Sequence, residues 1–221
     1  MRIKQLQLYT RNLEAQLAFY TQSLGLSLLV QTKDSFSVQV GWSVLSFTST
    51  DDFIPYHFCF LIPCNQLEEG LAWMDAQHHV LNNEDGRRVH HFDTWNADAF
   101  YFYDADGNLA ECIARHGLEN QSDQDFGPLS LLCINEIGMP TDQIAEVDTL
   151  LSKEMGSQFW KGDLSRFGTH GDEEGLLLLP NYKKKKTWFP TQMEVQQAPF
   201  EAVLEHEGNQ YNLLYNDEVI I

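Results

Sequence analysis

The order of predicted secondary structure repeats after about 50 residues, and this repeat constrains the fold more than any other feature of the chain. His57 follows Gln5 by 52 positions, and Asn65 follows Asn12 by 53. The first unit has strand patterns at 4–9, 26–32, 36–40 and 43–48, with a helix after the first. The second unit has them at 56–62, 89–92, 100–103 and 109–114, again with a helix after the first. We predict a duplicated βαβββ unit, because one helix followed by three strands suits neither a solenoid nor a propeller.

The helix of each unit is predicted from the residues at its ends. Asn12 suits an N-cap, apolar residues then recur at helical spacing, and Gly25 ends the helix. Asn65 has Glu68 three residues later, which is the spacing of a capping box. The two units therefore match in their helix starts as well as in their strands.

The second half of the chain repeats this order more loosely. Residues 117–127 are polar and resemble a linker. Beyond them we expect a strand at 129–137 and a helix that Thr141 caps. Further strands are expected at 158–160, 165–169, 175–179, 193–196, 201–206 and 210–215. We predict a paired-unit domain over 1–116 (units about 1–50 and 53–116), a linker at 117–127, and a degenerate second domain over 128–221.

Charge and cysteine usage exclude several classes of protein. The formal net charge of −18 disfavours nucleic acid and anionic membrane surfaces as partners. The chain has no apolar run of about 18 residues and no leader-like start, which predicts a cytoplasmic protein without a membrane span. None of the four cysteines forms a CxxC pair, so we expect buried free thiols rather than a structural zinc site.

Two segments of the first half resemble a known superfamily. The opening IKQLQLYTRNLEAQLAFYTQSLGLSLL resembles the first strand and helix of the vicinal oxygen chelate superfamily, which includes glyoxalases, bleomycin-resistance proteins and extradiol dioxygenases. AFYFYDADGNLAECIAR is similar to the hairpin of that superfamily in which a DPDG turn precedes a ligating glutamate. The resemblance covers residues 1–116 by motif and 128–221 by order of elements. It implies an α+β fold of tandem βαβββ modules that form cupped mixed sheets around a metal.

The resemblance also implies a set of metal ligands, since the superfamily draws them from the first and last strands of each unit. The corresponding positions are Gln5 and His57 on first strands, and Ser46 and Glu111 on last strands. Ser46 departs from the glutamate of glyoxalase I, and an extradiol-type triad would need histidine in place of Gln5. We predict Gln5, His57 and Glu111 as ligands of a divalent ion such as Fe²⁺, Mn²⁺, Ni²⁺ or Zn²⁺. Open positions on that ion would accept two adjacent oxygens of a substrate.

Further side chains are candidates for acid–base chemistry. His90 and His91 adjoin one another, so alternation places them on opposite faces and only one can reach the cavity. Tyr101 and Tyr103 share a face beside Glu111, where they line the pocket or pack against a helix. The pair at 78–79, both histidine, ends the second helix, where positive charge suits the helix dipole and no chemistry is implied.

Two functions remain open at this point. The first is a metal-dependent small-molecule enzyme of lyase, isomerase or ring-cleaving dioxygenase type. The second is a metal-free binding protein of the bleomycin-resistance type, whose pocket side chains would be Tyr101, Tyr103, Trp42 and Trp95. Family members commonly pair, so a homodimer is also expected. The run Lys183 to Lys186 predicts a solvated loop rather than a nucleic-acid surface, and the aromatic pair after it suggests a pocket lid, an interface or ordinary packing.

Overall fold

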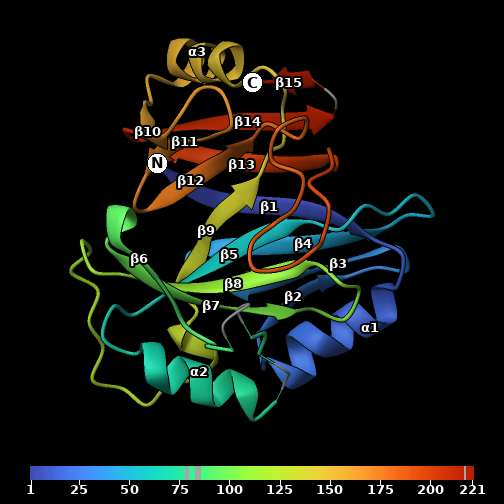
Figure 1. Ribbon diagram of the computed structural model, residues 1–221. Helices are drawn as coiled ribbons and strands as arrows, with labels where there is room; N and C mark the ends of the chain where they lie inside the picture. The colour runs from blue at the N-terminus through green and yellow to red at the C-terminus, as the bar shows by residue number, and fades with distance from the viewer. Residues whose placement is uncertain (78–79, 83–85, 217) are drawn as a thin grey trace.

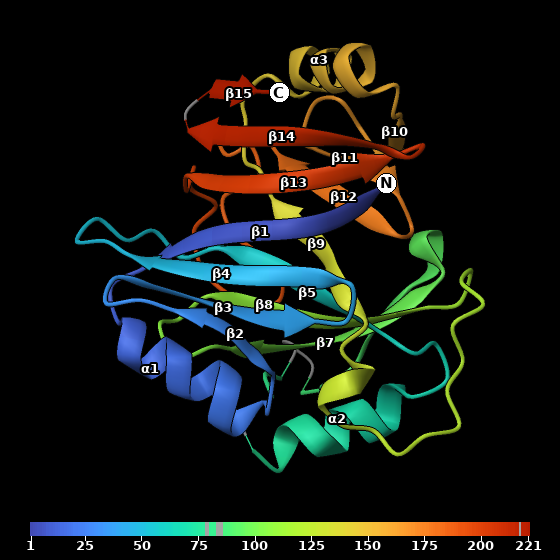
Figure 2. The same ribbon diagram turned by 180° about the vertical axis from the view of Figure 1, so that it is seen from behind.

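Two curled sheets packed against each other make up most of the molecule (Figures 1 and 2). The structure is a computed structural model that describes residues 1–77, 80–82, 86–216 and 218–221. One sheet has seven strands in the order β15-β14-β13-β1-β4-β3-β2, and the other has eight in the order β10-β11-β12-β9-β5-β8-β7-β6. Helices α1 and α2 lie together at one end of the molecule, and α3 lies at the other (Figure 1).

The elements follow the predicted order closely. The strands are β1 (Arg2–Thr10), β2 (Leu28–Gln31), β3 (Ser35–Val40), β4 (Ser43–Ser49), β5 (His57–Ile62), β6 (His90–Phe92), β7 (Ala97–Tyr103), β8 (Leu109–Arg115), β9 (Cys133–Gly138), β10 (Phe159–Gly162), β11 (Phe167–Asp172), β12 (Gly175–Pro180), β13 (Phe200–His206), β14 (Asn209–Asn216) and β15 (Glu218–Ile220). The helices are α1 (Leu13–Ala18), α2 (Leu67–Asp75) and α3 (Ile144–Met155), with short helical turns at Phe19–Ser23, Asp93–Trp95 and Pro128–Ser130. The mixed α+β fold of tandem βαβββ modules is thus confirmed.

The predicted division into domains differs from the way the sheets form. The first unit shares the seven-stranded sheet with the C-terminal strands, because β1 pairs antiparallel with β13. The second unit shares the eight-stranded sheet with the third, because β5 pairs antiparallel with β9. Both sheets therefore draw strands from each side of residues 117–127. The prediction of separate domains over 1–116 and 128–221 is wrong, since the free edges of β1 and β5 pair with strands from the other half of the chain.

The core lies between the two sheets, and the site lies on the outward face of one of them. In β1, Ile3, Leu6 and Leu8 are fully buried and join the same core as Phe58 and Phe60 of β5. The opposite face of the eight-stranded sheet carries a second apolar cluster that includes Leu61, Tyr101 and Trp188. Every residue of β5 and β8 is buried, because both faces of these central strands are covered.

Local signals in the sequence held in some places and failed in others. Asn12 caps α1 by accepting a hydrogen bond from the Ala15 backbone N–H at 3.2 Å. Asn65 does not cap α2, because its side chain instead exchanges two hydrogen bonds with the backbone of Ser122. The prediction for 78–79 lies outside the described residues. Across the described chain, no helix combines the length and apolar character needed to cross a bilayer.

Candidate metal centre

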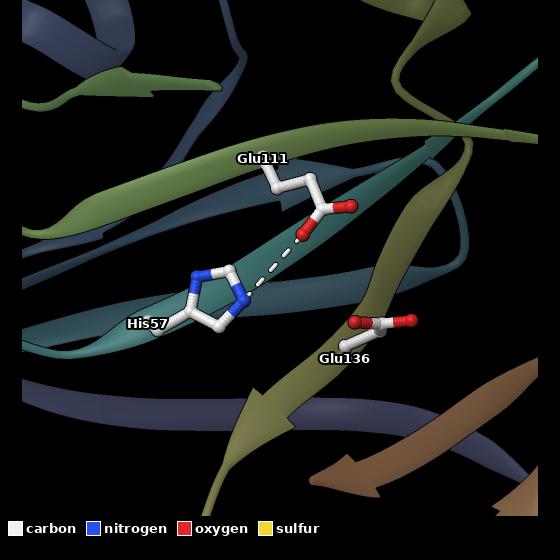
Figure 3. A group of neighbouring side chains, drawn as sticks. All are labelled: His57, Glu111 and Glu136. Carbon is white, nitrogen blue, oxygen red and sulfur yellow. Dashed lines mark ion pairs between the residues drawn. The ribbon is translucent and has the colours of Figure 1, made fainter. Parts of the chain in front are cut away.

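Three side chains from three adjacent strands converge on the outward face of the eight-stranded sheet (Figure 3). Cys59 of β5 lies opposite Glu111 of β8 on one side and opposite Glu136 of β9 on the other. Opposed residues in a sheet project to the same face, so both carboxylates point the same way. His57 lies two residues before Cys59 and shares that face. One donor atom from each of His57, Glu111 and Glu136 lies within 4.8 Å of the other two.

His57 is held in the orientation that a metal-ligating imidazole needs. Its Nδ1 lies 3.0 Å from the Leu109 carbonyl oxygen, to which it donates, and its Nε2 faces the Glu111 Oε2 at 3.4 Å. Burial lowers the pKa of His57 to about 4, so the ring is neutral near pH 7. A neutral ring that donates from Nδ1 has its free lone pair on Nε2, directed at the carboxylates.

The two carboxyl groups lie where ionisation is unfavourable. Glu111 and Glu136 are each 3% exposed. Burial, reinforced by the charge of Glu136, raises the pKa of Glu111 well above its usual value, although a hydrogen bond from Tyr101 opposes the rise. Burial also raises the pKa of Glu136, against the effect of Arg115. A buried pair of carboxyl groups is stable only when protons neutralise it or a cation compensates its negative charge.

Arg115 supplies one positive charge to this pair. Its guanidinium forms an ion pair with Glu136 through Nη2 and donates from Nε to the Asn135 Oδ1 at 2.8 Å. The side chain is fully buried and lies over the Trp160 ring, 5.3 Å from its centroid. Arg115 therefore fixes the position of Glu136 and offsets one of the two carboxylate charges.

The three donors open into a cavity of about 220 Å³. Most of its wall is apolar or aromatic, and Lys185 is the cation that lines it. Its lining residues are His57, Phe92, Trp95, Tyr101, Glu111, Ile113, Glu136, Gly162, Phe167, Leu178, Lys185, Trp188 and Phe189. A small apolar cavity with a few convergent polar groups is the usual form of a small-molecule site.

The donor set fits a divalent ion. A neutral imidazole and two carboxylates suit Fe²⁺, Mn²⁺ or Zn²⁺, and each donor is held by a neighbouring group: the Leu109 carbonyl, Tyr101 or Arg115. Ligands at about 2.1 Å from one ion lie at most about 4.2 Å apart, so the donors need only a small rotation to bind it. The last strand of the third unit contributes Leu178 to the cavity, which would leave coordination positions for other ligands.

The structure brings together two of the three predicted ligands. His57 and Glu111 face each other in the cavity, whereas Gln5 lies on the outward face of the seven-stranded sheet. There Gln5 is exposed and lines a separate hollow with Ser46 and Glu201. The prediction that Gln5 joins His57 and Glu111 is wrong, because the first unit pairs with the C-terminal strands rather than with the second unit.

Sequence reasoning missed Glu136, although the signal was present. Glu136 interrupts the apolar run of β9 just as Glu111 interrupts that of β8, and both strands are buried throughout. A carboxylate in such a strand needs a partner, and this signal is shared by Glu111 and Glu136. It was hidden by the expectation that the second half forms its own domain.

Of the acid–base candidates Tyr101, His90 and His91, only Tyr101 lines the cavity. Tyr101 lines the cavity beside Glu111, where its hydroxyl opposes the rise in the pKa of that carboxyl. His90 packs against Phe189, with ring centroids 4.5 Å apart. His91 lies outside the cavity, with its Nδ1 at 2.6 Å from a carboxylate oxygen of Asp98. This ion pair holds the ring at the surface, so of the two adjacent histidines His91 is the one that faces away from the cavity.

Some of the remaining predicted pocket residues line the cavity and others do not. Tyr103 is 38% exposed at the end of β7 and lies outside the cavity lining, as does Trp42, which borders a different hollow. Trp95 does line the cavity. Trp188 and Phe189 line it too, and Trp188 also belongs to the apolar cluster on that face of the sheet.

Comparison with known proteins identifies the fold. No family model and no curated protein matches the sequence. Among solved structures, a Bacillus subtilis protein whose assignment as a dioxygenase is provisional matches 81% of this chain and 63% of its own, with a TM-score of 0.56 and 15% identity. A mutant of glyoxalase I from Zea mays matches 81% of this chain and 69% of its own, with a TM-score of 0.55 and 12% identity.

The chain thus has the vicinal oxygen chelate fold, as its sequence motifs predicted. At these identities the likeness concerns the fold alone. The chemistry of this chain has to be argued from its own side chains.

Proposed function

We propose that this protein is a metal-dependent enzyme that acts on a small molecule bound through two adjacent oxygens. The observation that carries the proposal is the buried cluster of His57, Glu111 and Glu136 at the wall of an apolar cavity. Two carboxylates with 3% exposure are hard to maintain without a cation in contact with them, and Arg115 forms an ion pair with Glu136 alone.

The residues divide the work between binding and positioning. His57, Glu111 and Glu136 would hold a divalent ion such as Fe²⁺, Mn²⁺, Ni²⁺ or Zn²⁺, which would supply Lewis acidity toward the substrate oxygens or, if it is iron, the capacity to activate dioxygen. Tyr101 orients Glu111, and Arg115 orients Glu136. The aromatic wall excludes water from the bound substrate. The reaction class proposed is that of lyases, isomerases and ring-cleaving dioxygenases.

Metal analysis of single variants tests this proposal. We expect the purified protein to retain about one divalent ion per chain, and His57→Ala, Glu111→Gln and Glu136→Gln each to lose it by tenfold or more, because three protein donors set the affinity. His91→Ala and Glu201→Gln are matched controls outside the cluster and should keep the metal. Equal metal content in all five variants would remove the site.

A second function is favoured by one specific observation. The ion pair between Arg115 and Glu136 supplies positive charge to the cluster from the protein itself. With one proton on Glu111, the cluster of His57, Glu111, Glu136 and Arg115 would carry no net charge without a metal, as a metal-free binding protein requires. A wild-type protein that neither retains nor takes up a divalent ion would favour this alternative.

A further inference from the structure

One lysine of the run 183–186 turns into the cavity while the other three face solvent. Lys183, Lys184 and Lys186 are exposed, whereas Lys185 is partly buried and lines the site. The turn is fixed by the buried Asn181, whose backbone carbonyl accepts hydrogen bonds from the Lys184 and Lys185 N–H groups at 2.8 and 2.7 Å. Backbone hydrogen bonds of this turn therefore place Lys185 toward the cavity.

The segment that carries Lys185 is held by hydrogen bonds within its own loop and packs against the sheet through Trp188. The Trp188 N–H donates to the Met193 carbonyl at 2.8 Å, and the Val195 N–H donates to the Lys186 carbonyl at 2.9 Å. The Trp188 ring packs on His57, with centroids 4.7 Å apart. It also crosses β9 at Gly138, where an added Cβ would lie 2.7 Å from the ring. The loop after β12 thus covers the outward face of the eight-stranded sheet (Figure 1).

The ammonium of Lys185 uses only one of its three hydrogen-bond donors within the described part of the chain. It donates to the Thr187 carbonyl at 2.6 Å and lies 5.6 Å from the Trp188 ring centroid and 5.8 Å from that of Phe167. Within the described part of the chain, no carboxylate lies within ion-pairing distance of it. An ammonium has three donors, so two remain for a ligand. Burial lowers the pKa of Lys185 to about 8, which leaves it mostly charged at pH 7.

The charges around the cavity favour an anion once a metal is bound. Metal binding would ionise Glu111 and Glu136, and the positive charges of Arg115 and Lys185 would together balance their two negative charges. A divalent ion would therefore leave the site doubly positive. A neutral substrate would not compensate that charge in a water-poor cavity, whereas an anionic one would.

Size and wall chemistry restrict the rest of the ligand. The cavity of about 220 Å³ lies below the roughly 300–1,000 Å³ of pockets for drug-sized ligands. Phe92, Trp95 and Tyr101 give it flat apolar walls, which suit an aromatic ring through edge and face contacts.

We propose that Lys185 is a specificity-determining residue that binds the carboxylate of a compact aromatic substrate. The inference rests on the proposed function, since it assigns the reacting oxygens of that substrate to the His57, Glu111 and Glu136 cluster. The ammonium at one side of the cavity and the donor cluster at another would fix a single ring between them.

Binding of benzoate and its uncharged analogue benzamide tests this assignment. Titration calorimetry would compare wild-type protein, Lys185→Met, Lys185→Arg and the solvent-facing control Lys184→Met, each before and after chelator treatment. We expect wild-type protein to bind benzoate about tenfold or more tightly than benzamide, because the amide can accept a hydrogen bond from the ammonium but has no negative charge to pair with it. Lys185→Met should lose that preference, while Lys185→Arg and Lys184→Met should keep it.

Several outcomes would overturn the assignment. Absence of benzoate binding to wild-type protein would do so, as would equal binding of both ligands or unchanged benzoate affinity in Lys185→Met. A preference that vanishes on chelation would show that the carboxylate binds the metal instead. Equal loss of both ligands in Lys185→Met would mean that the residue only supports the cavity. Failure of the proposed function is distinguishable, because it appears as absent metal while the benzoate preference of chelator-treated protein persists.

Discussion

At the scale of single residues, the protonation of Glu111 and Glu136 governs what the site can bind. The raised pKa of both groups means that each holds a proton at higher pH than an exposed glutamate does. A metal binds the ionised oxygen, so it has to displace that proton. Proton and metal therefore compete for the same donors.

This competition predicts a pH-dependent metal affinity. As pH rises, the protonated fraction falls and the apparent dissociation constant should decrease, by about tenfold per pH unit while one proton is released. Titration of chelator-treated protein with Mn²⁺ or Zn²⁺ at pH 5.5, 6.5 and 7.5 would measure the slope. An affinity that stays flat over this interval would contradict the assignment of the two carboxyls as ligands.

At the scale of elements, a chain of hydrogen bonds ties helix α3 to strand β11. The His170 Nδ1 lies 2.7 Å from the Asp148 Oδ1, and its Nε2 lies 2.6 Å from the Ser157 Oγ. The order serine, histidine, aspartate matches that of a hydrolase triad. Ser157 is only 2% exposed and His170 is fully buried, so a substrate cannot reach the hydroxyl in the folded protein. We interpret these hydrogen bonds as a structural link that holds α3 against β11.

Loss of the hydrogen bond between Ser157 and His170 should lower stability without affecting the metal site. Ser157→Ala leaves the buried His170 Nε2 without its partner and should lower the free energy of unfolding by about 1–3 kcal/mol. Lys153→Ala, on the exposed side of the same helix, should change it by less than about 0.5 kcal/mol. Urea unfolding of both variants measures the difference. Equal stability of Ser157→Ala and wild-type protein would show that the hydrogen bond contributes nothing.

At the scale of the whole molecule, the pairing of units makes the two halves of the chain interdependent. A fragment of residues 1–116 would lack β13, the partner of β1, and β9, the partner of β5. It would expose the edges of β1 and β5 and the part of the core that packs against the missing half. The halves should therefore fold only together.

Fragment complementation tests this dependence. We expect residues 1–116 alone to show no cooperative thermal unfolding, and a mixture with residues 117–221 to regain it, because only the pair restores both sheets. Circular dichroism and urea titration of each fragment and of the mixture would measure this. Cooperative unfolding of the isolated 1–116 fragment would contradict the pairing of the units. Homodimer formation and cytoplasmic location stay predictions from the sequence.

Much of the architecture was open to prediction because its signals are local. Alternation, the Asn12 cap and the Gly25 stop define elements within a few residues, and the repeat reveals their order. The burial of Glu111 within an apolar strand was predictable for the same reason. Two of the three clustered donors, His57 and Glu111, were predicted from the ligand positions that the resemblance to the superfamily implies, and both belong to one unit.

The sequence alone determined the βαβββ units and the inward face of each strand, since both follow from periodicities of a few residues. Only the tertiary structure decided which units share a sheet, because every first strand presents a similar free edge and the choice depends on packing across the whole core. That choice placed Glu136 beside His57 and moved Gln5 to the other sheet. It also carried Lys185 over the cavity, where the loop that follows β12 crosses the second unit.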